Sequence, residues 1–251
     1  MVNFQIVSDL HIEYMDNEEI DMKEFITPVA DNLILAGDIG SLYREKQLFN
    51  FIEQCCDNFK QVYYVPGNHE YYTLKFINKV NQLYKLRGIL YSFEKKIPNL
   101  KILDRHYVEI DNYIIAGCTL WSNLDNNQLP KFRVRIADLN TRIYNIYFKR
   151  DVEFINKMIE SKRDDQEIIL ITHYPPTKSI ISPKSFDKFS FLYFSDLDHL
   201  LCKEKIHTWI CGHIHYNFNI HTDGGTHLVG NQKGRERDNI TDFSKNLVLA
   251  F

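Results

Sequence analysis

The sequence has no long apolar run and no strong excess of charge of either sign. Its 30 Lys and Arg residues nearly balance 33 Asp and Glu residues, and the formal net charge of the 251-residue chain is −3. This balance argues against a global positive field that would recruit long nucleic acid or an anionic membrane. No segment approaches the roughly 20 apolar residues that a membrane span requires. Because residues 1–7 also lack the basic start and long apolar region of a signal peptide, we expect no membrane partner.

Cysteine is scarce, and its spacing indicates neither a disulfide framework nor a zinc knot. The five cysteines are an odd number and include no Cys-x-x-Cys pair. Cys55 and Cys56 are adjacent, whereas Cys118, Cys202 and Cys211 lie in otherwise apolar stretches. Buried free thiols in a reducing compartment explain this pattern best, so we expect a cytoplasmic protein.

Internal repeats, low-complexity segments and linkers are also absent, and we therefore expect a single domain over residues 1–251. Short apolar runs, rich in Ile, Val and Tyr, predict buried strands. These runs are Phe4–Val7, Asn32–Ala36, Gln61–Val65, Tyr113–Cys118, Glu167–Ile171 and His207–Cys211.

Apolar residues at helical spacing lie between several of these runs. The three stripes are Leu48–Phe59, Phe76–Tyr84 and Val152–Ile159. Gly88 is expected to cap the second helix. This alternation of strands and helices predicts parallel strand pairing. Near the end of the chain, residues 216–222 and 226–229, which are split by a Gly-Gly turn, predict a hairpin. Residues 246–251 predict a last strand. The predicted fold class is therefore mixed α/β, with a parallel portion and an antiparallel portion.

Residue types that bind metals follow five of the predicted strands. The motifs are Asp9-Leu10-His11, Gly37-Asp38, Gly67-Asn68-His69-Glu70, Thr172-His173 and Gly212-His213-Ile214-His215. Ligands gather outside the carboxyl ends of strands in open α/β sheets, so all five groups should converge on one rim. In extended backbone, residues two apart, such as Asp9 and His11, should point to the same side. Carboxylate and amide oxygens mixed with imidazoles suit Mn, Fe or Zn better than Ca.

Three of the motifs alone have an ordinary structural explanation, whereas Gly-Asn-His-Glu and Gly-His-x-His are moderately specific by themselves. Asp-x-His arises by chance, Gly-Asp is a common turn, and a lone histidine such as His173 is more often packed or exposed at the surface. Five such motifs in this order, each at a strand end, make coincidence a poor explanation for the whole set.

In this order the motifs resemble those of the calcineurin-like metallophosphoesterase superfamily, and they extend over nearly the whole chain. The resemblance implies an α/β fold of the metallophosphoesterase type, a four-layer α-β-β-α sandwich with mixed sheets. It also implies two divalent metal ions, with Mn expected first and Fe or Zn as alternatives. The implied ligands of one ion are Asp9, His11, Asp38 and His215, and those of the other are Asp38, Asn68, His173 and His213.

The resemblance further implies a catalytic role for His69. This histidine would approach the phosphate as an acid or a charge stabiliser, held by a carboxylate such as Asp9 or Glu70. The implied reaction is attack of a metal-activated water on a phosphate ester.

Departures from better-known branches narrow the resemblance. Gly37-Asp38 continues as Ile39-Gly40-Ser41, without the Val-Asp-Arg-Gly signature of the protein Ser/Thr phosphatases. Ser41 stands where purple acid phosphatases have a metal-binding tyrosine, and Glu70 stands where cyclic-nucleotide phosphodiesterases usually have aspartate. The chain therefore resembles the small cytosolic relatives, whose substrates vary.

Among the functions that this site could carry, we expect a phosphomonoesterase. A phosphodiesterase or nuclease is the alternative; it would need a groove for the second ester arm, and the acidic balance argues against long nucleic acid. A non-catalytic metal-binding scaffold is a third hypothesis, but a scaffold would tend to lose ligands, whereas this chain keeps them all. No sequence feature indicates the natural substrate, the native metal pair or the oligomeric state.

Two segments are candidates for the mouth of the substrate site, because both follow predicted ligand-bearing or neighbouring strands. The first, residues 121–147, has the basic residues Lys131, Arg133, Arg135 and Arg142. The second, residues 174–194, is rich in Phe and Tyr, which with arginines would suit a small, nucleotide-like phosphorylated substrate. These aromatics could equally pack the loop or a dimer contact. Residues 231–235 could also reach the phosphate, but we expect them to form an exposed turn. The histidines expected to be structural or at the surface are His106, His199, His207, His221 and His227.

Overall fold

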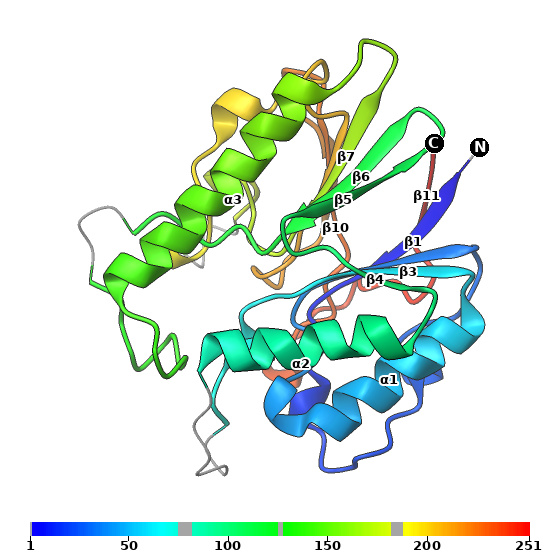
Figure 1. Cartoon of the computed structure of the whole chain (residues 1–251), viewed down its shortest axis with the longest axis vertical. Helices are drawn as coiled ribbons and strands as arrows, with labels where there is room; N and C mark the ends of the chain where they lie inside the picture. The colour runs from blue at the N-terminus through cyan, green and yellow to red at the C-terminus, as the bar shows by residue number, and fades with distance from the viewer. Residues whose placement is uncertain (1, 75–81, 125–127, 182–187) are drawn as a thin grey trace.

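The computed structural model describes residues 2–74, 82–124, 128–181 and 188–251, and two β-sheets stacked face to face form its centre (Figure 1). The strands of the first sheet are β1 (Asn3–Val7), β2 (Asn32–Ala36), β3 (Gln61–Val65), β4 (Leu100–Ile102) and β11 (Val248–Ala250). Their order is β11-β1-β2-β3-β4. β1 to β4 pair in parallel, and β11 pairs antiparallel with β1 at one edge.

The second sheet has four parallel strands between two antiparallel edges. Its strands are β5 (His106–Ile110), β6 (Tyr113–Cys118), β7 (Glu167–Thr172), β8 (Thr208–Ile210), β9 (Phe218–His221) and β10 (His227–Gly230). Their order is β5-β6-β7-β8-β10-β9. β6, β7, β8 and β10 are parallel, whereas β5 and β9 pair antiparallel with β6 and β10.

Helices cover the outer faces of both sheets. The α-helices are α1 (Glu45–Asn58), α2 (Leu83–Lys96) and α3 (Thr141–Ser161). Figure 1 shows α1 and α2 on the first sheet and α3 on the second. Short 3₁₀ turns are η1 (Ile12–Tyr14), η2 (Met22–Glu24), η3 (Leu42–Arg44), η4 (His69–Tyr71), η5 (Lys178–Ile180), η7 (Ser190–Leu192), η8 (Asp198–Leu200) and η9 (Glu236–Asp238). None of the helices in the described residues has the length and apolar character needed to cross a bilayer.

An apolar layer lies between the two sheets, built from alternate residues of their strands and from Leu103, which follows β4. Side chains alternate between the faces of a strand, so every second residue points inward. The buried members of this layer are Phe4, Ile6, Ile34, Ala36, Tyr63, Val65, Leu103, Ile115, Ile169, Ile171, Ile210, Val229 and Leu249. The intervening strand residues, such as Leu33, Leu35, Ile168 and Leu170, belong to the core that the helices cover. The predicted four-layer α-β-β-α sandwich with mixed sheets is therefore confirmed.

The sequence placed most strands within a residue or two of their observed bounds. The predicted hairpin is confirmed as β9 and β10, and the predicted last strand is shorter, as β11. Two strands were not predicted. β4 has only three residues, and β5 lies at a sheet edge, where its exposed residues gave no apolar run.

The prediction that Gly88 caps the second helix is wrong, because Gly88 lies inside α2. The buried residues Leu83, Leu86, Leu90 and Phe93 continue one apolar face past the glycine. A Cβ at Gly88 would meet nothing within 4 Å, so the helix simply tolerates a glycine on its open side. The residues from Phe76 to Val80 of the predicted stripe lie outside the described part of the chain.

The inter-sheet layer predicts a large stability effect at Ile169, which is 0% exposed and packs between the sheets. Ile169→Ala should lower the free energy of unfolding by about 2–5 kcal/mol, because it removes buried methyl groups and leaves a cavity. Ile220→Ala on β9 is the matched control, since Ile220 is 43% exposed, and it should cost less than about 1 kcal/mol. Urea unfolding of both variants checks this. Equal losses would contradict the assignment of Ile169 to a packed inter-sheet core.

Candidate metal centre

The loops that follow five parallel strands bring the predicted site residues together. Three of these strands, β1, β2 and β3, belong to the first sheet, and two, β7 and β8, belong to the second. The side chains that meet are Asp9, His11, Asp38, Asn68, His69, His173, His213 and His215. All predicted ligand positions and His69 therefore lie at one place, where the carboxyl ends of strands from both sheets converge.

One group of donor atoms surrounds Nε2 of His173. This nitrogen lies 3.2 Å from Asp38 Oδ2 and 3.1 Å from Asn68 Oδ1, and His213 Nδ1 lies 3.3 Å away. The other nitrogen, Nδ1 of His173, donates to the carbonyl oxygen of Ala36 at 3.0 Å. That bond assigns the lone pair to Nε2, so four electron-pair donors face one another. Such an arrangement fits a cation.

A second group of donor atoms forms around His11 and His215. Their Nε2 atoms lie 3.0 Å apart, and Nε2 of His215 lies 3.3 Å from Asp9 Oδ1. Each ring donates its Nδ1–H to a carboxylate: His11 to Glu13 at 3.1 Å and His215 to Asp238 at 2.5 Å. This carboxylate–histidine arrangement is typical of metal-ligating histidines, because it directs the Nε2 lone pair toward the metal.

Asp38 connects the two groups. Its Oδ2 lies 3.2 Å from His173 Nε2 and 3.9 Å from His11 Nε2. Three sets of side chains in the described residues have ligand atoms within 4.8 Å of one another, and Asp38 belongs to two of them. The donor set therefore fits the pair of divalent ions that the motifs predict, with Asp38 as the shared carboxylate.

The backbone at these positions is not extended, contrary to the prediction for Asp9 and His11. Both residues have φ near 53°, in the left-handed region, and the φ of Asp38 is 52°. His213 and His215 also have positive φ, at 74° and 49°. Left-handed backbone is strained for residues other than glycine, and such strain gathers at functional sites. The paired residues converge because each backbone turns sharply, not because side chains alternate along a strand.

Glycine permits a close approach between backbone and carboxylates at two positions. A Cβ at Gly67 would overlap Asp38 Oδ1 and would lie 2.9 Å from Cδ2 of His173. A Cβ at Gly212 would lie 2.5 Å from Asp9 Oδ2. Any side chain at either position would push a predicted ligand out of the cluster.

The carboxylate that holds His69 is Glu13, and the predictions of Asp9 or Glu70 for this role are wrong. His69 Nδ1 lies 2.8 Å from Glu13 Oε1, the same oxygen that accepts from His11. Glu13 is 1% exposed and sits in η1, directly after the turn at His11. The sequence offers one signal for this role, namely a carboxylate two residues after the predicted ligand His11. The direction in which the Glu13 side chain points, however, depends on the turn at His11.

Glu70 has a different task, because it braces the loops that carry Asp38 and Asn68. Its carboxylate accepts the backbone N–H groups of Gly67 at 2.8 Å, Asp38 at 3.1 Å and Ile39 at 2.8 Å. The hydroxyl of Tyr64 donates to it at 2.6 Å. Four donors on one buried carboxylate fix the strand ends of β2 and β3 relative to each other.

Electrostatics favour a cation at this site. Burial alone would raise the pKa of Asp38, but the positive charges of His173 and His69 hold it well below its usual range. Burial lowers the pKa of His173, but Asp38 more than offsets this and raises the pKa to about 9. Burial and the charge of His173 lower the pKa of His213 to about 3. The high pKa of His173 means that its Nε2 lone pair, beside the anionic carboxylate of Asp38, attracts a proton strongly. The same pair of groups also attracts a divalent cation.

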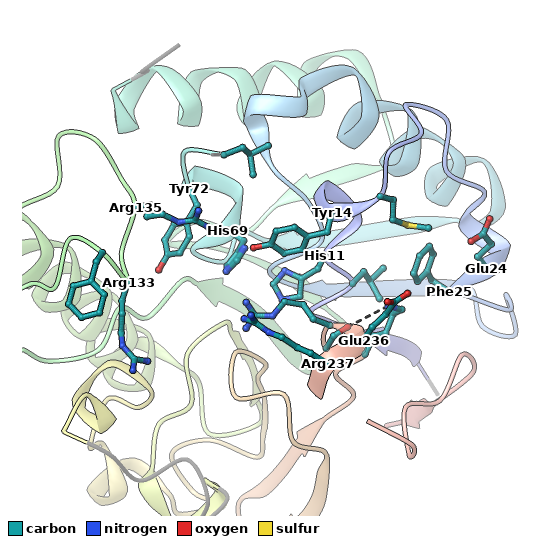
Figure 2. A pocket seen from close by; sticks show the side chains of 17 residues that line it. His11, Tyr14, Glu24, Phe25, His69, Tyr72, Arg133, Arg135, Glu236 and Arg237 are labelled. Carbon is teal, nitrogen blue, oxygen red and sulfur yellow. Dashed lines mark hydrogen bonds between the residues drawn. The ribbon is translucent and has the colours of Figure 1, made fainter. Parts of the chain in front are cut away.

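A cavity of about 990 Å³ opens onto the site, with His11 and His69 in its wall (Figure 2). Three residues of the predicted mouth segment 121–147 line the cavity, namely Phe132, Arg133 and Arg135, whereas Lys131 and Arg142 do not.

The aromatic segment 174–194 packs against the site. Tyr174 stacks on the predicted ligand His213 with ring centroids 3.9 Å apart. Phe189 contacts Phe132 of the other mouth segment, with ring centroids 5.4 Å apart. Tyr174 and Phe189 therefore pack against protein groups, whereas the predicted Phe186 lies outside the described residues.

The prediction that residues 231–235 form an exposed turn is wrong. Asn231 and Gln232 are buried, and Gln232 Oε1 accepts the backbone N–H of His215 at 2.7 Å. Lys233, Gly234 and Arg235 line the cavity. The segment thus supports a predicted ligand and forms one wall of the mouth. The five histidines predicted to be structural or at the surface belong to none of the donor groups in the described residues.

The family model for calcineurin-like phosphoesterases matches residues 3–217, which is most of the chain. The chain belongs to this family. It is therefore a metal-dependent hydrolase of phosphoric esters, as the motifs predict. An uncharacterized protein, L509, from Acanthamoeba polyphaga mimivirus is 27% identical over 279 aligned residues, which cover 95% of this chain and 94% of that relative.

Two solved structures have a fold similar to that of this chain. Phosphopantetheinyl hydrolase from Mycobacterium tuberculosis superposes with a TM-score of 0.76 at 16% identity, covering 94% of this chain and 90% of that one. A dimetal phosphatase from Danio rerio superposes with a TM-score of 0.58 at 10% identity, covering 91% and 86%. At these identities the likeness shows the fold.

The shared position of Asp38 predicts that its loss weakens metal binding more than any other ligand change. Substitution of a residue that only hydrogen-bonds to a metal ligand typically lowers metal affinity by about 10- to 100-fold. Asp38→Asn changes a predicted ligand itself, so it should lower metal affinity at least that much. Asp57→Asn, at an exposed position on α1, is the matched control. Metal titration followed by elemental analysis of both folded variants measures the effect. Unchanged affinity in folded Asp38→Asn protein would rule out a bridging role.

Proposed function

We propose that this protein is a phosphomonoesterase that hydrolyses small phosphorylated substrates with the help of two divalent ions. The observation that carries the proposal is the convergence of two donor groups on Asp38 beside a cavity whose wall contains His69. When bound, the two ions supply Lewis-acid stabilisation of phosphate charge and lower the pKa of an attacking water. Mn²⁺ is the proposed metal, with Fe or Zn as alternatives that the mixed oxygen and imidazole donors also suit.

The donor groups support a specific division of the ligands. Contacts around His11 and His215 favour one ion held by Asp9, His11, Asp38 and His215. Contacts around His173 favour the other ion held by Asp38, Asn68, His173 and His213. The Nδ1 bonds of three of these histidines, to Glu13, Asp238 and the carbonyl of Ala36, orient the rings for this role.

His69 is the proposed catalytic residue. Its Nδ1 bonds to Glu13, so Nε2 remains to hold or transfer a proton, and its ring lines the cavity. Tyr72 stacks on the ring with centroids 4.6 Å apart and limits its rotation. These contacts support a role for His69 in protonating the leaving oxygen of the ester. His69 also has a ligand atom near those of His11 and Asp38, so a ligand role is the competing hypothesis.

The substrate class is proposed from the composition of the cavity. The wall contains both aromatic rings, such as Tyr14 and Tyr72, and arginines, which favours a nucleotide-like phosphorylated molecule through stacking and charge. A phosphodiesterase is the second candidate, because a cavity of about 990 Å³ has room for a second ester arm. The five free cysteines support a reducing compartment, and the cytoplasmic location stays a prediction.

A comparison of two substrates tests the proposed reaction. With added Mn²⁺, p-nitrophenyl phosphate should be hydrolysed at least about tenfold faster than bis-p-nitrophenyl phosphate, because a monoester presents more anionic oxygens to the two ions. Initial rates at equal concentrations, with and without a chelator, measure the preference. A faster rate on the bis ester would replace the proposal with a phosphodiesterase, and turnover that persists without metal would contradict the two-ion model.

The role of His69 predicts a loss that depends on the leaving group. His69→Asn should lower kcat by about 10²- to 10⁴-fold for an alkyl phosphate, the range typical of general acid catalysis. The loss should be much smaller for p-nitrophenyl phosphate, because nitrophenolate leaves without a proton. Metal content should stay near that of the wild type. An equal loss on both substrates would make His69 a charge stabiliser, and a loss of metal would make it a ligand.

Glu13→Gln provides the companion variant for this test. If Glu13 acts through His69, its substitution should lower kcat for the alkyl phosphate in the wild type and have little further effect in the His69→Asn background. Additive effects in the double variant would indicate that Glu13 acts through its other partner, His11.

A further inference from the structure

Arg135 lies in the cavity close to the proposed acid and contacts the ring that stacks on it. Its guanidinium carbon lies 5.8 Å from the centroid of the Tyr72 ring, and Tyr72 stacks on His69. Figure 2 shows Arg135 beside Tyr72 at the end of the cavity opposite Glu24. The side chain is half-buried and lines the cavity. A positive charge is thus held close to the leaving-group side of the site.

The backbone around Arg135 fixes this position. Its carbonyl oxygen accepts the backbone N–H of Thr73 at 2.8 Å and the Thr73 hydroxyl at 2.6 Å. The flanking residues Val134 and Ile136 are both buried. The segment is therefore anchored to the residue that follows Tyr72, and this anchoring does not depend on the arginine side chain.

Other cations in the cavity are engaged with protein groups. Arg235 Nε lies 3.4 Å from Asp238 Oδ2, and Arg133 donates to the Tyr193 hydroxyl at 3.0 Å. Arg237 is mostly exposed and lies 3.9 Å from Asp238 Oδ1. Arg135 forms no ion pair with a carboxylate in the described ranges of the chain; its side chain bonds to Tyr14 and contacts the Tyr72 ring. A half-buried guanidinium without a protein counter-ion is costly unless a ligand supplies the charge.

We propose that Arg135 binds a second anionic group of the substrate, carried by the leaving group of the phosphate ester. The inference rests on the proposed phosphoesterase function and narrows its substrate class. Because a general acid lies beside the leaving oxygen, an arginine in contact with the Tyr72 ring that stacks on His69 is on the leaving-group side of the cavity. The planar guanidinium binds carboxylate and phosphate in the same forked geometry, so the second group is an anion of either kind.

Three aryl phosphates with phenolate leaving groups test this subsite. Phenyl phosphate has no second anion, 4-carboxyphenyl phosphate adds a carboxylate, and 4-(phosphonomethyl)phenyl phosphate adds a phosphonate. Wild-type protein loaded with Mn²⁺ should favour at least one anionic probe over phenyl phosphate by about 10- to 100-fold in kcat/KM, the range for hydrogen bonds to charged groups. Arg135→Gln should abolish most of this preference, and Arg135→Lys should retain part of it. Which anionic probe is favoured distinguishes a carboxylate from a phosphate-like group.

Arg237→Gln is the matched control, since it removes the same charge from the same cavity at an exposed position. It should change the preference by less than about threefold. The inference is overturned if wild-type protein shows no preference for either anionic probe, if Arg135→Gln keeps the preference, or if Arg237→Gln removes it equally.

Equilibrium binding separates this inference from the proposed function. Benzylphosphonate and 4-carboxybenzylphosphonate cannot be hydrolysed, and calorimetry measures their affinity without turnover. If none of the three aryl phosphates is hydrolysed, the proposed function fails, whereas tighter binding of the carboxylated probe that is lost in Arg135→Gln still supports the subsite. Equal binding of both probes by wild-type protein would exclude it.

Discussion

The carboxylate of Asp38 is the group on which the geometry of the site depends. It follows β2 in the first sheet, where its Oδ1 accepts the backbone N–H of His69 at 2.7 Å. Its Oδ2 lies 3.2 Å from Nε2 of His173, which follows β7 in the second sheet. One side chain therefore links both halves of the sandwich. Because the apolar layer between the sheets fixes their spacing, that layer also sets the distances within the donor groups.

The concentration of buried charge at one rim has a structural cost that neighbouring groups offset. Glu70 accepts four donors, and Glu13 accepts from two histidines through one oxygen. Oε2 of Glu13 has no hydrogen-bond partner within the described residues. Left-handed backbone at five of the proposed ligands adds strain of about 1–3 kcal/mol each. The rest of the fold follows ordinary alternation of apolar residues, so the unfavourable features gather where a cation and a phosphate would use them.

The sequence predicted the strands and the convergence of the motifs because both depend on local pattern. Continuous apolar runs identify buried strands, and parallel strands send their carboxyl ends to one edge. Glu13 was missed because its contact with His69 depends on the turn at His11, which no periodicity reveals. Gly88 was misjudged because a helix tolerates glycine where its apolar face continues. The cavity wall was only partly predicted, since residues 133–135 and 233–237 are far apart in the sequence and meet only in the folded chain.

The distribution of charge explains how a chain with a net charge of −3 can have a cavity with a mostly basic wall beside the candidate metal centre. Five Lys and Arg side chains line the cavity, against the carboxylates of Glu24 and Glu236. A concave surface with low-dielectric walls focuses the electric field of the charges that line it. A local excess of positive charge can therefore dominate in the cavity although the net charge of the chain is negative. A field confined in this way acts on groups that fit into the cavity. The total charge therefore argues against long nucleic acid, while the local charge favours a small anion, and the two inferences are compatible.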